Sequence, residues 1–190
     1  MKKVIIIGAS GSLAGHVIEE LQKQKDVQLT LFLRNKNRLH KSNLSNATII
    51  EGDVMYYPAL KEAIKGQDIV YVNLAGNLEA MAKNIVKSMQ ETGVKRIIAI
   101  SSIGIYKTPL QSILVPYRKL ADVIESSGLE YTILRPDWFT NSNEVDYTLT
   151  KKGEPEKGTA ISRKSIAAFI ATIIENPEKH SRENLGIAKP

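Results

Sequence analysis

Residues 3–15 read KVIIIGASGSLAG, and this stretch decides the fold. Its first part, Lys3 to Ile7, is a continuous apolar run rich in β-branched residues, which is typical of a strand buried on both faces of a parallel sheet. Apolar residues then recur at helical spacing, at Leu13, Val17, Ile18 and Leu21. The sequence therefore predicts a strand, a glycine-rich turn over residues 8–15 and a helix, in that order.

The glycine-rich turn has the composition of a phosphate-binding site. Gly8 lets the chain turn sharply, and Gly11 lets the backbone approach a diphosphate closely. The N-terminus of the following helix presents free N–H groups and the positive end of the helix dipole. We therefore expect a bound dinucleotide to contact Gly8, Ser10, Gly11, Ser12 and Leu13. The alternative is a tight strand–helix turn that binds no ligand.

The rest of the chain alternates between predicted strands and predicted helices. Further strands are expected at Val27–Leu33, Ala47–Glu51, Asp68–Asn73, Lys95–Ile100, Glu130–Leu134 and Leu185–Ala188. Helices are expected at Pro58–Ile64, Leu78–Glu91, Pro116–Ser126 and Ser165–Glu175. This alternation predicts an α/β fold: a doubly wound parallel sheet of the Rossmann type with helices on both faces. Strands one to three should lie on one side of the switch point and strand four onward on the other.

Composition indicates one domain with a substantial core. The chain has 190 residues, of which 43% are hydrophobic and 24% charged, close to the globular average. We predict a single NAD(P)-binding domain over 1–190, with a small substrate-side region around 136–162. Residues 137–158 are the least regular stretch, as in many functional loops.

Several classes of protein are disfavoured by what the sequence lacks. There is no cysteine, and His16, His40 and His180 show no metal-ligand spacing, so no metal site is expected. No apolar run approaches the roughly 18 residues that a membrane span needs, and the first residues do not resemble a signal peptide. We expect a cytoplasmic protein without a membrane partner. Aromatic residues make up only 6%, so nucleic-acid binding through the formal +6 charge is also disfavoured.

The pattern Gly8-x-x-Gly11-x-x-Ala14-Gly15 resembles the short-chain dehydrogenase/reductase superfamily, in its extended and atypical branches. Four later motifs agree with this resemblance: Glu51–Val54, Asn73–Gly76, Ser101-Ser102 and residues 127–136, SGLEYTILRP. The last resembles the atypical group, which includes NmrA-like proteins and the flavin/biliverdin reductase type. The resemblance implies that Asp53, with Val54 beside it, contacts the adenine, and that Asn73, Ala75 and Gly76 line the cofactor site.

The end of the second strand predicts a preference for NADP(H). An NAD-specific site carries an Asp or Glu there, which binds the ribose hydroxyls and repels a 2′-phosphate. Here strand residues Leu31–Leu33 run into Arg34, and no carboxylate occurs between Val27 and Glu51. Arg34 can bind a phosphate with two nitrogens, and Arg38 and Lys36 could add charge. The alternative is a solvated basic loop, extending to Lys41.

The catalytic residues are harder to assign, because the family's Tyr-x-x-x-Lys motif is missing. Tyr117 and Lys119 are two residues apart, which places them on different faces of a helix. We take Ser102, Tyr106, Tyr117 and Lys119 as the candidates, and we expect the three hydroxyls to lie beside Asn73–Gly76 at the open end of the sheet. Asp137, where the family usually has glycine, and Trp138 begin the irregular stretch and are candidates to line a substrate pocket.

These observations favour an NADPH-dependent oxidoreductase that reduces a small carbonyl, quinone or flavin-like acceptor. The cofactor would carry the hydride chemistry, and the protein would orient it. The alternative is a non-catalytic NADP(H)-binding regulator of the NmrA-like kind, which the missing Tyr-x-x-x-Lys favours. A sugar-nucleotide epimerase is possible by fold, but 190 residues leave little room for a substrate domain. The sequence does not indicate an oligomeric state.

Overall fold

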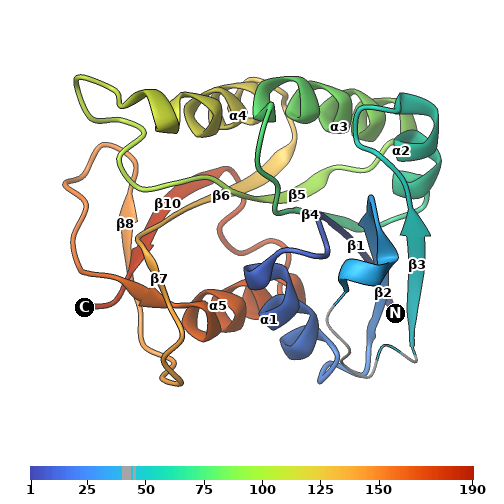
Figure 1. Ribbon diagram of the computed structural model, residues 1–190, viewed down its shortest axis with the longest axis horizontal. Helices are drawn as coiled ribbons and strands as arrows, with labels where there is room; N and C mark the ends of the chain where they lie inside the picture. The colour runs from blue at the N-terminus through green and yellow to red at the C-terminus, as the bar shows by residue number, and fades with distance from the viewer. Residues whose placement is uncertain (40–43, 45) are drawn as a thin grey trace.

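The computed structural model describes residues 1–39, 44 and 46–190. In these residues, an eight-stranded sheet lies between two layers of helices (Figure 1). Its strands are β1 (Lys2–Ile7), β2 (Val27–Leu33), β3 (Ala47–Glu51), β4 (Ile69–Val72), β5 (Arg96–Ile100), β6 (Glu130–Pro136), β8 (Thr148–Lys151) and β10 (Glu183–Ala188). Two short strands, β7 (Phe139–Thr140) and β9 (Ile161–Ser162), pair with each other outside this sheet.

The strand order is β3-β2-β1-β4-β5-β6-β10-β8, and only β8 runs antiparallel to its neighbour. β1 lies between β2 and β4, so the chain reverses its winding direction at β1, and the predicted doubly wound sheet is confirmed. Ile7 pairs with Phe32 of β2 and with Val72 of β4. The carboxyl ends of these three strands are therefore level, and the loops that follow them meet at one edge of the sheet.

The helices cover both faces of the sheet. α1 (Ser12–Leu21) and α5 (Arg163–Glu175) pack on one face, and α2 (Tyr57–Ile64), α3 (Leu78–Thr92) and α4 (Val115–Glu125) pack on the other (Figure 1). Short 3-10 helices lie at Lys36–Arg38 and Ser112–Leu114. No helix in the described ranges has the length and apolar character needed to cross a membrane.

The apolar run of β1 is explained by its position in the middle of the sheet. Val4 and Ile6 face the layer of α1 and α5, whereas Ile5 and Ile7 face the layer of α2 to α4. All four side chains are fully buried. A strand with a helix layer on each side has no solvent face, so it has no polar alternation.

The C-terminal part of the chain is more regular than expected. β6 continues to Pro136, which pairs with Ile187, rather than ending at Leu134. Pro136 lacks a backbone N–H, but its carbonyl oxygen accepts a hydrogen bond from Ile103 N at 3.1 Å. The region expected to be irregular also contains β7 and β8, and β8 extends the sheet as its edge strand beside β10.

Candidate functional site

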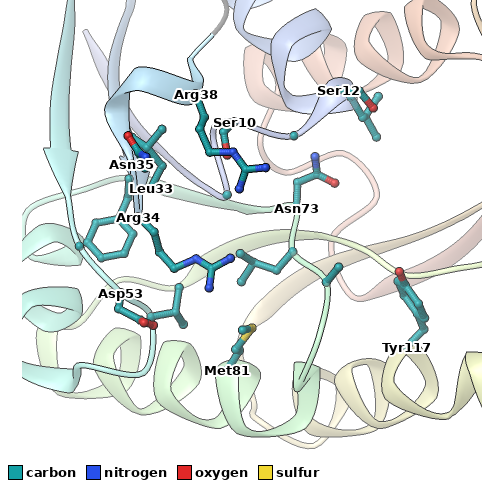
Figure 2. A pocket seen from close by; sticks show the side chains of 18 of the residues that line it. Ser10, Ser12, Leu33, Arg34, Asn35, Arg38, Asp53, Asn73, Met81 and Tyr117 are labelled. Carbon is teal, nitrogen blue, oxygen red and sulfur yellow. The ribbon is translucent and has the colours of Figure 1, made fainter.

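A pocket of about 710 Å³ lies at the edge of the sheet where the loops after β1, β2, β3 and β4 meet (Figure 2). Residues from these loops, from the end of β2 and from α1, α3, α4 and β7 line it. They are Gly8, Ser10, Gly11, Ser12, Leu13, Phe32, Leu33, Arg34, Asn35, Arg38, Gly52, Asp53, Val54, Asn73, Leu74, Ala75, Met81, Tyr117 and Phe139. The pocket thus joins the glycine-rich turn to the basic loop after β2, as the order of the strands requires.

The glycine-rich turn packs directly against the loop after β4. Gly8 has φ +89°, and a Cβ atom at this position would lie 2.1 Å from the carbonyl oxygen of Asn73. A Cβ atom on Gly11 would lie 2.9 Å from Nδ2 of Asn73. Both distances are below normal contact. A side chain at Gly8 would push the backbones of the two loops apart, and one at Gly11 would displace the side chain of Asn73. The two glycines keep the turn close to Asn73 and leave the space above it for a ligand.

The N-terminus of α1 forms one wall of the pocket. Gly11 is its N-cap residue, and no side chain of the described residues caps the helix. The first N–H groups of α1 are therefore available to a ligand, and they carry the positive end of the helix dipole. This is the arrangement by which Rossmann proteins hold a diphosphate.

Two arginines form the basic side of the pocket. Arg34 follows β2 directly, and Asn35 caps the short helix Lys36–Arg38 by accepting a hydrogen bond from Asn37 N at 2.9 Å. This cap places Arg38 on the same side as Arg34, and Figure 2 shows both side chains extending toward Asn73 in the middle of the pocket. Within the described residues, neither guanidinium pairs with a carboxylate.

A carboxylate of β3 binds the backbone of this loop. Glu51 is paired with Leu33 in the sheet, and its Oε2 accepts a hydrogen bond from the backbone N of Lys36 at 2.9 Å. Neither Glu51 nor Lys36 lines the pocket. Glu51 thus fastens the loop that carries Arg38 and does not take the place of an NAD-selective acid. Lys41, the last member of the predicted basic cluster, lies outside the described residues.

The loop after β3 forms the side opposite Ser12. Asp53 is exposed, and its Oδ1 accepts a hydrogen bond from Met55 N at 2.8 Å, whereas Val54 is buried. A Cβ atom on Gly52 would lie 2.8 Å from the ring of Phe32. Sequence reasoning missed Gly52 and Phe32 as lining residues, although their positions at the ends of β3 and β2 are a usable signal.

The loop after β4 places Asn73, Leu74 and Ala75 in the pocket but not Gly76. Gly76, at φ +104°, leads into Asn77, whose Oδ1 accepts a hydrogen bond from Ala80 N at 3.3 Å and caps α3. Gly76 therefore serves the turn into α3. Eleven of the twelve residues predicted to bind the cofactor lie together around one pocket.

Of the four catalytic candidates, only Tyr117 lines the pocket, and its hydroxyl points toward it (Figure 2). Lys119 forms an ion pair with Glu79, with Nζ 2.9 Å from Oε2. The hydrogen bond from Lys119, with a second from Lys83, holds the pKa of the Glu79 carboxyl below its ordinary value. Ser102 donates its hydroxyl to the carbonyl oxygen of Ile103 at 3.1 Å. Among the described residues, no Tyr–Lys pair forms at the pocket.

Tyr106 belongs to a different polar cluster. Its hydroxyl accepts a hydrogen bond from Nδ2 of Asn184 at 2.7 Å, and cationic groups of Arg118 and Lys152 lie 4.8 and 4.7 Å from its ring centre. Burial, reinforced by the charge of Glu125, raises the pKa of the Tyr106 phenol. Tyr106 is therefore engaged away from the pocket.

Residues 136–162 contribute one lining residue, Phe139, which sequence reasoning missed. Its neighbour Trp138 does not line the pocket, and its side chain is 80% exposed. Asp137 accepts a hydrogen bond from Trp138 N at 2.6 Å. In the part of the chain that the structure describes, no group of His, Cys, Asp or Glu side chains is arranged to hold a metal ion.

The fold and the pocket define a Rossmann protein of the dinucleotide-binding class. The chain belongs to the NAD(P)H-binding family, whose model matches residues 8–177. A solved Rossmann-fold NAD(P)-binding family protein from Shigella flexneri is similar to it, with 49% sequence identity and a TM-score of 0.93 over 100% of this chain and 94% of the other. A short-chain dehydrogenase/reductase from Veillonella parvula, solved in complex with NADP, shares 26% identity with a TM-score of 0.90, over 100% and 95% of the two chains.

A curated relative is also similar to most of this chain. The chain is 28% identical over 171 residues to an isoflavone reductase homolog, A622-like, from Nicotiana tabacum. That match covers 83% of this chain and 53% of the relative, so this chain spans about half of that protein's length. The predicted membership in the atypical short-chain dehydrogenase/reductase superfamily is confirmed.

Proposed function

We propose that the pocket binds NADP(H) and that the protein is an NADPH-dependent reductase of a quinone, flavin-like or small carbonyl acceptor. The observation that carries the proposal is the pair of guanidiniums, Arg34 and Arg38, that extend into the pocket without a carboxylate partner among the described residues. Two such cations match a terminal 2′-phosphate. The glycines at positions 8 and 11 leave room for the diphosphate beside them. The relative from Veillonella parvula was solved with NADP.

Each wall of the pocket would bind a different part of the cofactor. Arg34 and Arg38 would hold the 2′-phosphate, the first N–H groups of α1 the diphosphate, and the loop around Asp53 the adenine. The other end, lined by Leu74, Ala75, Tyr117 and Phe139, would receive the nicotinamide and the acceptor. When bound, NADPH supplies a hydride. The apolar side chains at this end would pack against the nicotinamide ring.

The proton source favours one class of acceptor. Reduction of the acceptor would need a proton as well as the hydride, and Tyr117 or water would supply it. Lys119 is held in an ion pair by Glu79, so its ammonium group is not placed beside the Tyr117 hydroxyl to assist a proton transfer. Quinones and flavins stabilise the charge of the reduced product and take protons readily from water. We therefore expect them to be reduced in preference to simple aldehydes.

The same ion pair supports a second candidate, a non-catalytic NADP(H)-binding regulator. Such a protein needs the cofactor pocket but no proton donor, which fits a pocket with one tyrosine and no lysine among its described lining residues.

One experiment separates the two functions. NADPH consumption is followed with a panel of quinones, flavins and aldehydes, after NADPH binding has been shown by titration. Turnover of quinones or flavins, retained in Tyr117→Phe, supports the reductase. Tight binding with no turnover across the panel supports the regulator, and a failure to bind NADPH overturns both.

A further inference from the structure

Arg163 lies beside the glycine-rich turn, although it follows Ser12 by 151 residues in the chain. It is the first residue of α5, which is capped by Ser162 through a hydrogen bond that Ser162 Oγ accepts from Ser165 N at 3.0 Å. α5 packs against α1 (Figure 1). As a result, Nε of Arg163 donates to Oγ of Ser12 at 3.1 Å. The guanidinium therefore lies at the N-terminus of α1.

The same guanidinium also holds the segment that forms the far wall of the pocket. Nη1 donates to Oδ1 of Asn141 at 2.9 Å and to the carbonyl oxygen of Thr140 at 3.5 Å. Its Cζ lies 5.1 Å from the ring centre of Phe139, which lines the pocket. Arg163 thus connects the phosphate-binding end of α1 to a side chain at the acceptor end.

The charge of Arg163 has no anionic partner among the described residues. It stands instead at the positive end of a helix dipole, where a cation is disfavoured and an anion is favoured. Arg163 is not itself among the lining residues, but it contacts two of them, Ser12 and Phe139. Two positive features placed side by side favour an anion bound between them. The diphosphate of the dinucleotide is the anion that the pocket's layout brings to this place.

We propose that Arg163 binds the cofactor diphosphate together with the N-terminus of α1, and that this contact fixes Phe139 against the acceptor. The inference rests on the proposed placement of NADP(H). It makes the cofactor part of the acceptor site, because the diphosphate would hold in place the guanidinium that contacts Phe139. The acceptor should therefore bind after the cofactor.

The first test compares two ligands. Loss of a charged hydrogen bond weakens binding about tenfold, so Arg163→Ala should weaken NADPH binding by about that factor. Adenosine 2′-monophosphate lacks the diphosphate, and its affinity should be unchanged. Arg34→Ala should weaken both ligands. The matched control is Lys164→Ala, because Lys164 follows Arg163 on α5 and, among the described residues, neither lines the pocket nor joins an ion pair.

The second test uses the only tryptophan of the chain, Trp138, as a reporter beside Phe139. Titration with NADP⁺ should change the emission of Trp138 in the unmodified protein and in Lys164→Ala, but not in Arg163→Ala saturated with cofactor. Arg163→Lys keeps the charge but cannot bridge Ser12 and Asn141 as a planar fork does. It should recover much of the NADPH affinity without the change in emission.

The outcomes distinguish this inference from the proposed function. If the unmodified protein binds no NADPH, the proposed function fails and this inference fails with it. If it binds NADPH but Arg163→Ala binds equally well, only the role of Arg163 is overturned. An emission change that is absent from the unmodified protein, or equal in Arg163→Ala, would overturn the coupling to Phe139.

Discussion

At the scale of single residues, the choice between the two nicotinamide cofactors depends on Arg34. The guanidinium reaches into the pocket, while Glu51 at the end of β3 is bound to the backbone of Lys36. Arg34→Ala should therefore weaken NADPH binding by about tenfold, the worth of one charged hydrogen bond. NADH lacks the 2′-phosphate, so its affinity should hardly change. Titration of both cofactors into both proteins at fixed salt measures the difference.

The control for this prediction is Lys36→Ala. Lys36 carries the same charge on the same loop but does not line the pocket. Its removal should therefore weaken NADPH binding only slightly, through the loss of a long-range electrostatic attraction. Equal affinity of the unmodified protein for NADH and NADPH would contradict the assignment of Arg34 to a 2′-phosphate.

The cofactor-binding residues could be predicted from the sequence more readily than the catalytic ones. The cofactor candidates follow directly from the ends of β1 to β4, because parallel strands bring their following loops to one edge. The catalytic candidates depend on partners far along the chain. Lys119 is held by Glu79 and Tyr106 by Asn184, 78 residues away. No local pattern indicates such pairings. The sequence therefore could not show that only Tyr117 of the four candidates lies at the pocket.

At the scale of secondary-structure elements, β4 carries an unpaired polar group in the core. The side chain of Tyr71 is fully buried, and its hydroxyl has no hydrogen-bond partner among the described residues. Burial raises the pKa of this phenol above its ordinary value. A buried hydroxyl without a partner costs about 1–3 kcal/mol, so Tyr71→Phe should raise the free energy of unfolding by about 1 kcal/mol, measured by urea denaturation.

Tyr57→Phe serves as the comparison for this prediction. Its hydroxyl donates to Oε2 of Glu91 at 2.6 Å near the surface, where the loss of one hydrogen bond changes stability by about 0.5 kcal/mol or less. If Tyr71→Phe is destabilised instead, the hydroxyl has a partner in solution, such as a buried water molecule.

The elements themselves differ in how readily the sequence predicts them. β1, β2 and β5 are rich in apolar residues and are bounded by polar or glycine residues, and the structure places them within one residue of the predicted ranges. β8 reads Thr-Leu-Thr-Lys, is half-exposed, and pairs on one side only, with β10. Its strand conformation is stabilised by this pairing with a distant segment, so local sequence does not reveal it.

At the scale of the whole molecule, a buried ion pair ties residues 136–162 to the sheet. Arg135 of β6 has a side chain only 2% exposed, and its Nη1 pairs with Oε1 of Glu156. Oε2 of Glu156 accepts a hydrogen bond from Gly104 N at 3.1 Å, and Nε of Arg135 donates to Asn184 of β10 at 2.8 Å. The loop after β5, the substrate-side region and the last strand of the parallel set therefore share one polar cluster.

This cluster predicts that the substrate-side region and the sheet unfold as one unit. Glu156→Ala leaves the Arg135 charge buried without its partner, a change that costs about 3 kcal/mol or more. In urea denaturation followed by far-UV circular dichroism, the midpoint should fall accordingly while the transition stays single and its slope m is unchanged. Lys157→Ala, an exposed neighbour, should shift the free energy by no more than about 0.5 kcal/mol. An early second transition, or a smaller m value in Glu156→Ala, would mean that residues 136–162 fold separately from the sheet, against the prediction of a single domain over residues 1–190.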